Sequence, residues 1–150
     1  LVSGETFVPD NRMTASSEWS EFHGPQRARM DAVKEGLFNG GWVAQTWSSN
    51  QWIQVEFDEP MLVQKVKTKG RDDYTQWVES YLLLFGLDGQ QWETYQEPFG
   101  TDKVLVFTGN TDNITPVEHS LLAPVKAKFV RFQVQTWSAN GIGFRLELFG

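Results

Sequence analysis

The stretch "WIQVEFDEP", residues 52–60, is the clearest indication of the fold class. Ile53, Val55 and Phe57 alternate with polar side chains, which is the period-two pattern of a strand with one face in a core. Pro60 ends the run, because proline cannot donate a hydrogen bond to a neighbouring strand. The stretch therefore predicts a half-buried β-strand and no helix.

Similar short runs follow along the whole chain, separated by Gly, Pro, Asn and Asp. They are "LVQKVKTKG" (62–70), "VESYLLLFG" (78–86), "WETY" (92–95), "KVLVFTG" (103–109), "KFVRFQVQTW" (128–137) and "GFRLELFG" (143–150). Asp88-Gly89 is a hairpin signal between two of them. About seven or eight strands with regularly spaced turns predict an all-β sandwich or barrel.

The strand pattern also predicts the core. The run 78–86 is apolar on both faces, as expected of a central strand that is covered on both sides. The predicted core residues are Phe57, Val66, Leu82, Leu84, Phe132 and Leu146.

Composition excludes several classes of function. The chain has 150 residues, a net charge of −6 and no cysteine. An acidic domain is a poor candidate for nucleic acid, whose binding depends on neutralising phosphates. Thiol catalysis and cysteine-based zinc sites are excluded, and no apolar run approaches the roughly 18 residues of a membrane span. The sequence also lacks H-E-x-x-H, G-x-S-x-G, Walker and G-x-G-x-x-G motifs, so we expect no enzyme, no cofactor and no metal.

A family resemblance extends over nearly the whole chain. In order, it consists of "MTASSEW", "QRARMD", "GGW", "QWIQVEF", "TKGR", "WVESYLLLFGLDGQQW", "VFTGNTDN", "APVKAKFVRFQVQTW" and "FRLELFG". Together these blocks resemble the discoidin domain, also called the coagulation factor V/VIII C-type domain. We therefore expect residues 1–150 to form one discoidin-like domain.

The resemblance implies an eight-stranded, jelly-roll-like β-sandwich of the discoidin, galactose-binding-like type, with its termini close together. It implies loops at one end that bind membrane lipids, glycans or proteins such as collagen. It also implies a module of a larger secreted or cell-surface protein. The family usually has a cysteine pair at the ends of the domain, and this sequence lacks it.

Three tryptophans in "WVAQTWSSNQW", residues 42–52, receive different interpretations. Trp42 follows two glycines and matches an aromatic position of the family, so we expect it in the core. Trp52 has the opposite parity to the buried side chains of its strand and is interpreted as a structural shield. Trp47 lies in a polar loop, where a binding loop of the family falls, and we expect it to be exposed rather than folded back as a loop anchor.

Two further loops are expected to meet the Trp47 loop. "SEWSEFHG" (17–24) offers Trp19, Phe22 and His23, although Trp19 is equally compatible with a place in the core. "GRDDYTQW" (70–77) offers Arg71, Asp72 and Tyr74. The candidate ligand-binding residues are Trp19, Phe22, His23, Trp47, Arg71, Asp72 and Tyr74.

Other charged positions are assigned to structure. Basic residues recur at period two at positions Lys65, Lys67, Lys69 and Arg71. They indicate either a basic stripe for an anionic ligand or, as we favour, a solvated strand face whose lysines also prevent edge pairing. Arg131 and Arg145 alternate with apolar residues and are expected to form ion pairs within the domain. Asn113 begins an N-glycosylation sequon, which Pro116 follows directly.

These observations predict a non-catalytic extracellular adhesion module that binds a cell-surface glycan or a collagen- or receptor-like protein. The alternative is a phosphatidylserine-binding module that inserts the same loop aromatics into an anionic membrane. Carboxylates beside the aromatics, such as Glu18 and Glu21, favour a glycan or protein over a lipid.

Overall fold

A computed structural model of the chain describes residues 1–3, 8–97 and 103–150. Within these ranges it contains eight strands and three short 3₁₀ segments. The strands are β1 (Met13–Ala15), β2 (Trp42–Val43), β3 (Trp52–Lys69), β4 (Val78–Gly86), β5 (Glu93–Thr94), β6 (Phe107–Thr108), β7 (Val117–Trp137) and β8 (Gly143–Phe149). The 3₁₀ segments are η1 (Asp10–Arg12), η2 (Glu21–His23) and η3 (Pro25–Ala28).

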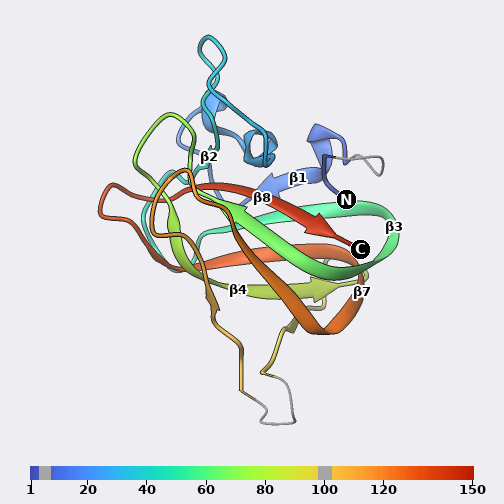
Figure 1. Cartoon of the computed structure of the whole chain (residues 1–150). Helices are drawn as coiled ribbons and strands as arrows, with labels where there is room; N and C mark the ends of the chain where they lie inside the picture. The colour runs from blue at the N-terminus through green and yellow to red at the C-terminus, as the bar shows by residue number, and fades with distance from the viewer. Residues whose placement is uncertain (4–7, 98–102) are drawn as a thin grey trace.

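Two long strands, β3 and β7, hold the sandwich together. The pairing order is β2-β8-β3-β7-β4-β5, with β1 added on β3 and β6 on β4. β7 pairs with both parts of β3. On the other side of β3, residues 53–55 pair with β1 and residues 65–69 pair with β8. Register shifts between Glu56 and Met61 and between Val63 and Lys65 mark where β3 bends from one layer to the other (Figure 1). The predicted all-β sandwich is confirmed.

The core lies between the layers and is built on aromatic contacts. The Tyr81 ring stacks on Phe107 at 5.4 Å between centroids and packs against Phe132 at 5.3 Å. Phe144 meets Phe132 edge-on at 5.4 Å. Four of the predicted core residues are buried, namely Phe57, Val66, Phe132 and Leu146.

The prediction was wrong for Leu82 and Leu84 in β4. Tyr81, Leu83 and Phe85 point into the core, whereas Leu82 and Leu84 are only half-buried on the outer face. No further sheet or helix of the described residues covers this face, so β4 is not covered on both sides. The apolar residues on both faces misled the parity assignment, because polarity alone did not identify the inner face.

The lysines of β3 lie on a solvated strand face. The Lys65 and Lys67 ammonium groups lie 3.5 Å and 3.4 Å from the carboxylate of Glu118 on β7. Their strand is not an edge here, because it pairs with β7 on one side and β8 on the other. The favoured interpretation as a solvated face is supported, but the suggested protection against edge pairing was wrong.

The two arginines expected to form ion pairs, Arg131 and Arg145, form none with any carboxylate of the described residues. Arg145 is buried and donates to the backbone carbonyls of Gly70, Ala32 and Asn113. Arg131 is half-buried and donates to the Gln54 side chain. Backbone carbonyls and an amide therefore replace the expected counter-charges.

The ends of the chain lie side by side (Figure 1). The Leu1 ammonium group donates to the Leu148 carbonyl at 2.7 Å and lies 3.1 Å from a carboxylate oxygen of Glu147. The expected closeness of the termini is confirmed.

Candidate functional site

Five connecting segments contact one another, namely residues 17–24, 35–39, 44–51, 70–77 and 138–142. Residues 70–77 and 138–142 lie at the left of Figure 1, away from the two termini. We call the exposed and half-buried side chains there the recognition surface. Its members are Trp19, Phe22, His23, Leu37, Phe38, Trp47, Arg71, Asp72 and Tyr74. The seven residues predicted to bind a ligand are therefore neighbours, together with Leu37 and Phe38, and their contact with a ligand stays a prediction.

Trp19 and Trp47 form a stacked pair on this surface. Their ring centroids are 6.0 Å apart and their planes differ by 7°. Trp19 is 57% exposed and Trp47 is 38% exposed, so neither is in the core. The Trp19 amide donates to the Val43 carbonyl at 2.8 Å, which fixes the first loop against β2. By contrast, Trp42 is buried in the core, as predicted.

The loop 138–142 packs against the Trp47 ring. Gly141 has a φ of +117°, and an added Cβ would overlap the Trp47 indole. The neighbouring Asn140 side chain donates to the Thr75 hydroxyl at 2.7 Å. One short loop therefore connects the tryptophan pair to the loop that carries Tyr74.

A β-hairpin tip beside Phe22 adds two apolar residues that the sequence interpretation missed. Glu35 and Phe38 exchange two backbone hydrogen bonds of 2.9 Å around Gly36, whose φ is +59°. The tip leaves Leu37 73% exposed and Phe38 46% exposed, with the Phe38 ring edge-on to Phe22 at 5.4 Å. The signal was an apolar pair next to a glycine in "EGLFNG".

Arg71 organises the loop 70–77 and has little capacity left for a ligand. Its guanidinium donates to Asp73 at 2.8 Å and 3.1 Å, to Gln76 at 2.9 Å and to the side chain of Asn39 at 2.8 Å. Four of its five N–H groups are thus occupied. It also lies over the Tyr74 ring at 5.3 Å from the centroid. These contacts make Arg71 a support for Tyr74, which is exposed. A direct contact between Arg71 and a ligand stays a prediction.

The carboxylates of this loop also make structural contacts. Burial alone would raise the pKa of Asp73, but hydrogen bonds from Arg71 and the Gly40 amide outweigh it and hold that pKa below its ordinary value. The Asp72 amide donates to the Gly40 carbonyl at 2.8 Å, and its Oδ2 accepts from the Lys34 amide at 3.3 Å. Asp72 is half-buried and keeps Oδ1 as its available acceptor.

His23 is held by the first loop. Its Nδ1 lies 2.7 Å from the Ser20 hydroxyl, which also accepts from the Phe22 amide at 3.2 Å. Burial and the nearby positive charge of Arg71 lower the pKa of His23, which favours the neutral ring. A neutral, locally bonded imidazole contributes shape and hydrogen bonding but no charge.

Asn113 adjoins the same loop. Its side-chain amide lies 3.5 Å from the Asp72 carbonyl, and the sequon hydroxyl of Thr115 donates to Asp112 at 2.8 Å. Asn113 is half-buried. Its use as a glycosylation site stays a prediction.

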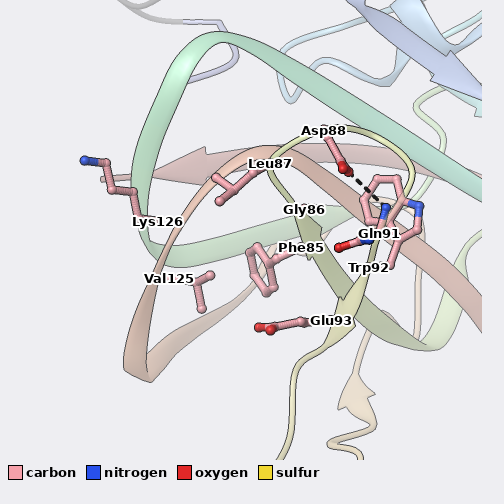
Figure 2. Close-up of a pocket in the computed structure, with 9 residues that line it drawn as sticks. All are labelled: Phe85, Gly86, Leu87, Asp88, Gln91, Trp92, Glu93, Val125 and Lys126. Atoms are coloured by element: carbon pink, nitrogen blue, oxygen red, sulfur yellow. Dashed lines mark hydrogen bonds between the residues drawn. The ribbon is translucent and has the colours of Figure 1, made fainter.

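A separate hollow lies at the other end of β4. Figure 2 shows its lining, which includes Phe85, Trp92, Glu93 and Val125, and its volume is about 540 Å³. The recognition-surface loop 70–77 precedes β4, whereas this hollow follows it. It is therefore distinct from the recognition surface.

The architecture and the loop arrangement agree with a match to a known family. The family model of the F5/8 type C domain matches residues 12–148. The chain belongs to this family. F5/8 type C domains generally serve as binding modules and not as enzymes. No helix in the described ranges is long and apolar enough to cross a membrane.

Two curated relatives contain a similar F5/8 type C domain. Hemocytin of Bombyx mori is 35% identical over 150 residues, which is 100% of this chain and 5% of hemocytin. Lactadherin of Bos taurus is 35% identical over 151 residues, which is 95% of this chain and 34% of lactadherin. The chain thus spans much less than the full length of either relative.

Solved structures show the same fold. Discoidin II from Dictyostelium discoideum superposes with a TM-score of 0.81 at 25% identity, covering 91% of this chain and 52% of that protein. Chitosan-binding module 2 of a Paenibacillus sp. IK-5 chitosanase/glucanase, solved with chitotriose, has a TM-score of 0.67 at 19% identity. That match covers 92% of this chain and 95% of the module, and at this identity it shows the fold alone.

Proposed function

We propose that this F5/8 type C domain is a non-catalytic recognition module that binds a cell-surface glycan through the recognition surface. The observation that carries the proposal is the exposed, parallel pair of Trp19 and Trp47. The exposed parts of these two stacked rings are flat apolar surfaces of the kind on which the C–H faces of sugar rings pack. Placing such large aromatic surface in water is unfavourable unless a ligand covers it.

Polar groups around the pair supply partners for sugar hydroxyls. The exposed side chains of Gln45, Thr46, Ser49 and Asn50 surround Trp47 in its loop. Binding sites for small polar ligands combine aromatic walls with a few such donors and acceptors. Amides and hydroxyls carry no charge, which supports a neutral sugar as the ligand.

The setting of the domain is part of the proposal. The matched relatives are much longer than this chain, which supports a module of a larger multidomain protein. We place that protein outside the cell, secreted or at the cell surface. A collagen- or receptor-like protein is a second possible class of partner for the same surface, because aromatic residues also dominate protein interfaces.

The exposed hairpin tip favours one alternative function. Leu37, Phe38 and Tyr74 are exposed apolar or aromatic side chains, which would suit insertion into a phosphatidylserine membrane. Glu21, Glu35 and Asp31 are exposed nearby, and their charges would be repelled by anionic lipid. The balance of charge therefore supports the glycan.

A parallel binding experiment tests the proposal. The purified chain is applied to a glycan array and to liposomes with and without phosphatidylserine. We expect the chain to bind glycans on the array. A free neutral sugar should compete for this binding, and added salt should not abolish it. Trp47→Ala should weaken it by about 1–3 kcal/mol, whereas Leu122→Ala, which removes an exposed side chain of β7, should not. Binding to phosphatidylserine liposomes without any glycan signal would support the membrane alternative instead.

A further inference from the structure

The outer face of the sheet carries a second polar site, away from the recognition surface. Across the ladder, Gln54 of β3, Arg131 of β7 and Leu84 of β4 are register neighbours. All three are half-buried. Arg131 thus lies in the middle of a sheet face that no other layer of the described residues covers.

Two tryptophans hold the Arg131 guanidinium between them. Its central carbon lies 3.8 Å from the ring centroid of Trp52 and 4.3 Å from that of Trp92. Trp92 is placed by the turn after β4, in which Asp88 accepts hydrogen bonds of 2.9 Å from the amides of Gln90 and Gln91. Figure 2 shows this turn, with the bond from Gln91 dashed and Trp92 beside it. Cation–π contacts with two indole rings therefore hold the guanidinium in place.

One edge of the guanidinium is occupied and the other is open. Nε and Nη2 both donate to Oε1 of Gln54, at 3.1 Å and 2.8 Å. A guanidinium has five N–H groups, so both groups on Nη1 and one on Nη2 remain. Nη1 has no hydrogen-bond partner among the described residues and is not fully buried. The open Nη1–Nη2 edge has the spacing that a carboxylate fits with two parallel hydrogen bonds.

Arg131 has no counter-charge among the described residues, and no backbone carbonyl accepts from it as carbonyls do from Arg27 and Arg145. Arg12, Arg29 and Arg71 each form an ion pair with an aspartate, at 2.7 Å, 2.6 Å and 2.8 Å. Burial alone lowers the pKa of Arg131, with no contribution from an acidic group. The nearby Glu56 pairs with Lys128 at 3.9 Å. A partly desolvated charge without a partner favours any anion that can reach it.

From this geometry we propose that Arg131, between Trp52 and Trp92, binds the carboxylate of an acidic sugar residue. A single guanidinium matches a singly charged carboxylate, whereas a doubly charged phosphate would need a second cation. The indole edges beside the open side offer apolar contact to the sugar ring. The site is independent of the recognition surface and of the neutral glycan proposed there.

The direct test is an NMR titration of the whole chain with sodium D-glucuronate, using methyl D-glucoside as the uncharged control. We expect saturable shifts of the indole N–H signals of Trp52 and Trp92 with glucuronate only. Arg131→Lys keeps the charge but loses the planar edge, and should weaken binding about tenfold or more. Arg12→Lys is the matched control and should leave binding unchanged. No shift with glucuronate, or equal binding by Arg131→Lys, would overturn the proposal.

A second variant tests the uncompensated charge without removing the stack. Gln54→Glu places a counter-charge on the edge of Arg131 that Gln54 already occupies, so it should clearly weaken the glucuronate shifts while the fold is retained. Gln64→Glu makes the same charge change at an exposed position of β3 and should bind normally. Undiminished glucuronate binding by Gln54→Glu would contradict the site. Trp47→Ala should bind glucuronate as the parent does, which separates this inference from the proposed function.

Discussion

The Trp19 and Trp47 rings lie parallel at 6.0 Å, although they come from different loops of the sandwich. Trp19 precedes η2, and Trp47 lies between β2 and β3. Neither ring reaches the core, so the stack is a surface arrangement that the loops must hold in place. In the proposed function the two rings form one platform for the glycan, so a change in either ring should weaken binding.

The first prediction concerns coupling between these two rings. Trp19→Ala and Trp47→Ala should each weaken glycan binding by about 1–3 kcal/mol, because each removes half of the platform. The double variant should lose clearly less than the sum of the two, because a single remaining ring has no stacked partner to position it. Isothermal titration of the four proteins with the glycan found on the array measures the coupling. Strict additivity would mean that the rings bind independently.

The second prediction concerns the support under Trp47. Gly141→Ala should displace the Trp47 indole and weaken glycan binding, because the added methyl group occupies the ring's position. Gly36→Ala is the matched control, since Gly36 also has a positive φ but an added Cβ meets nothing within 4 Å. Both variants should lose about 1–2 kcal/mol of stability from backbone strain. Equal glycan affinity of the two would show that Gly141 does not position Trp47.

The third prediction tests the inner and outer faces of β4. Leu83→Ala should lower the free energy of unfolding by about 2–5 kcal/mol, because Leu83 is fully buried. Leu84→Ala should cost only about 1 kcal/mol, because Leu84 is half-buried on the outer face. Urea unfolding followed by tryptophan fluorescence gives both values. The reverse order would mean that the parity of β4 is inverted.

The fourth prediction separates the glycan from the membrane. Leu37→Ser removes the most exposed apolar side chain of the hairpin tip and should leave glycan binding within about 0.5 kcal/mol of the parent value. If the tip inserts into lipid, the same change should instead weaken binding to phosphatidylserine liposomes by about 1–2 kcal/mol. Co-sedimentation with liposomes and titration with the glycan measure the two effects on one protein.

The fifth prediction is a dependence of stability on pH. The pKa of Asp73 is lower in the folded protein, so ionised Asp73 stabilises the fold above its unfolded pKa. That contribution is lost as the pH falls through the lower, folded value. Asp73→Asn should therefore be less stable than the parent by about 1–3 kcal/mol at pH 7, and the gap should narrow towards pH 3.

Thermal unfolding of both proteins across this range provides the measurement. Asp58→Asn serves as the control, because the Asp58 side chain is 83% exposed in its pair with Arg12 and should change stability little. A gap between Asp73→Asn and the parent that stays constant from pH 7 to pH 3 would contradict the assigned role of Asp73.

Local sequence patterns were sufficient to predict which side chains are buried wherever the two faces of a strand differ in polarity. Alternation in residues 52–57 predicted the buried Phe57 and the outward Trp52, because a strand exposes successive side chains on opposite faces. The family blocks supplied the sandwich and the close termini. The polar setting of Trp47 in its loop predicted its exposure.

Only the tertiary structure decided the features that depend on contacts between segments distant in the sequence. Both faces of β4 are apolar, so its inner face is set by packing of Tyr81 and Leu83 against other strands. The sequence around Arg71 does not show its partners. The fold places Asn39, Asp73 and Gln76 around its guanidinium, and these side chains accept most of its hydrogen bonds.

The arrangement of side chains on the outer face of the sheet also depends on contacts between distant segments. Arg131 is distant in sequence from both Trp52 and Trp92, so their stack depends on the β3–β7 register and on the turn after β4. Periodicity reports how one segment divides its side chains between two faces. It contains no information about partners from elsewhere in the chain, and those partners determine whether a charged side chain is satisfied within the fold or remains available to a ligand.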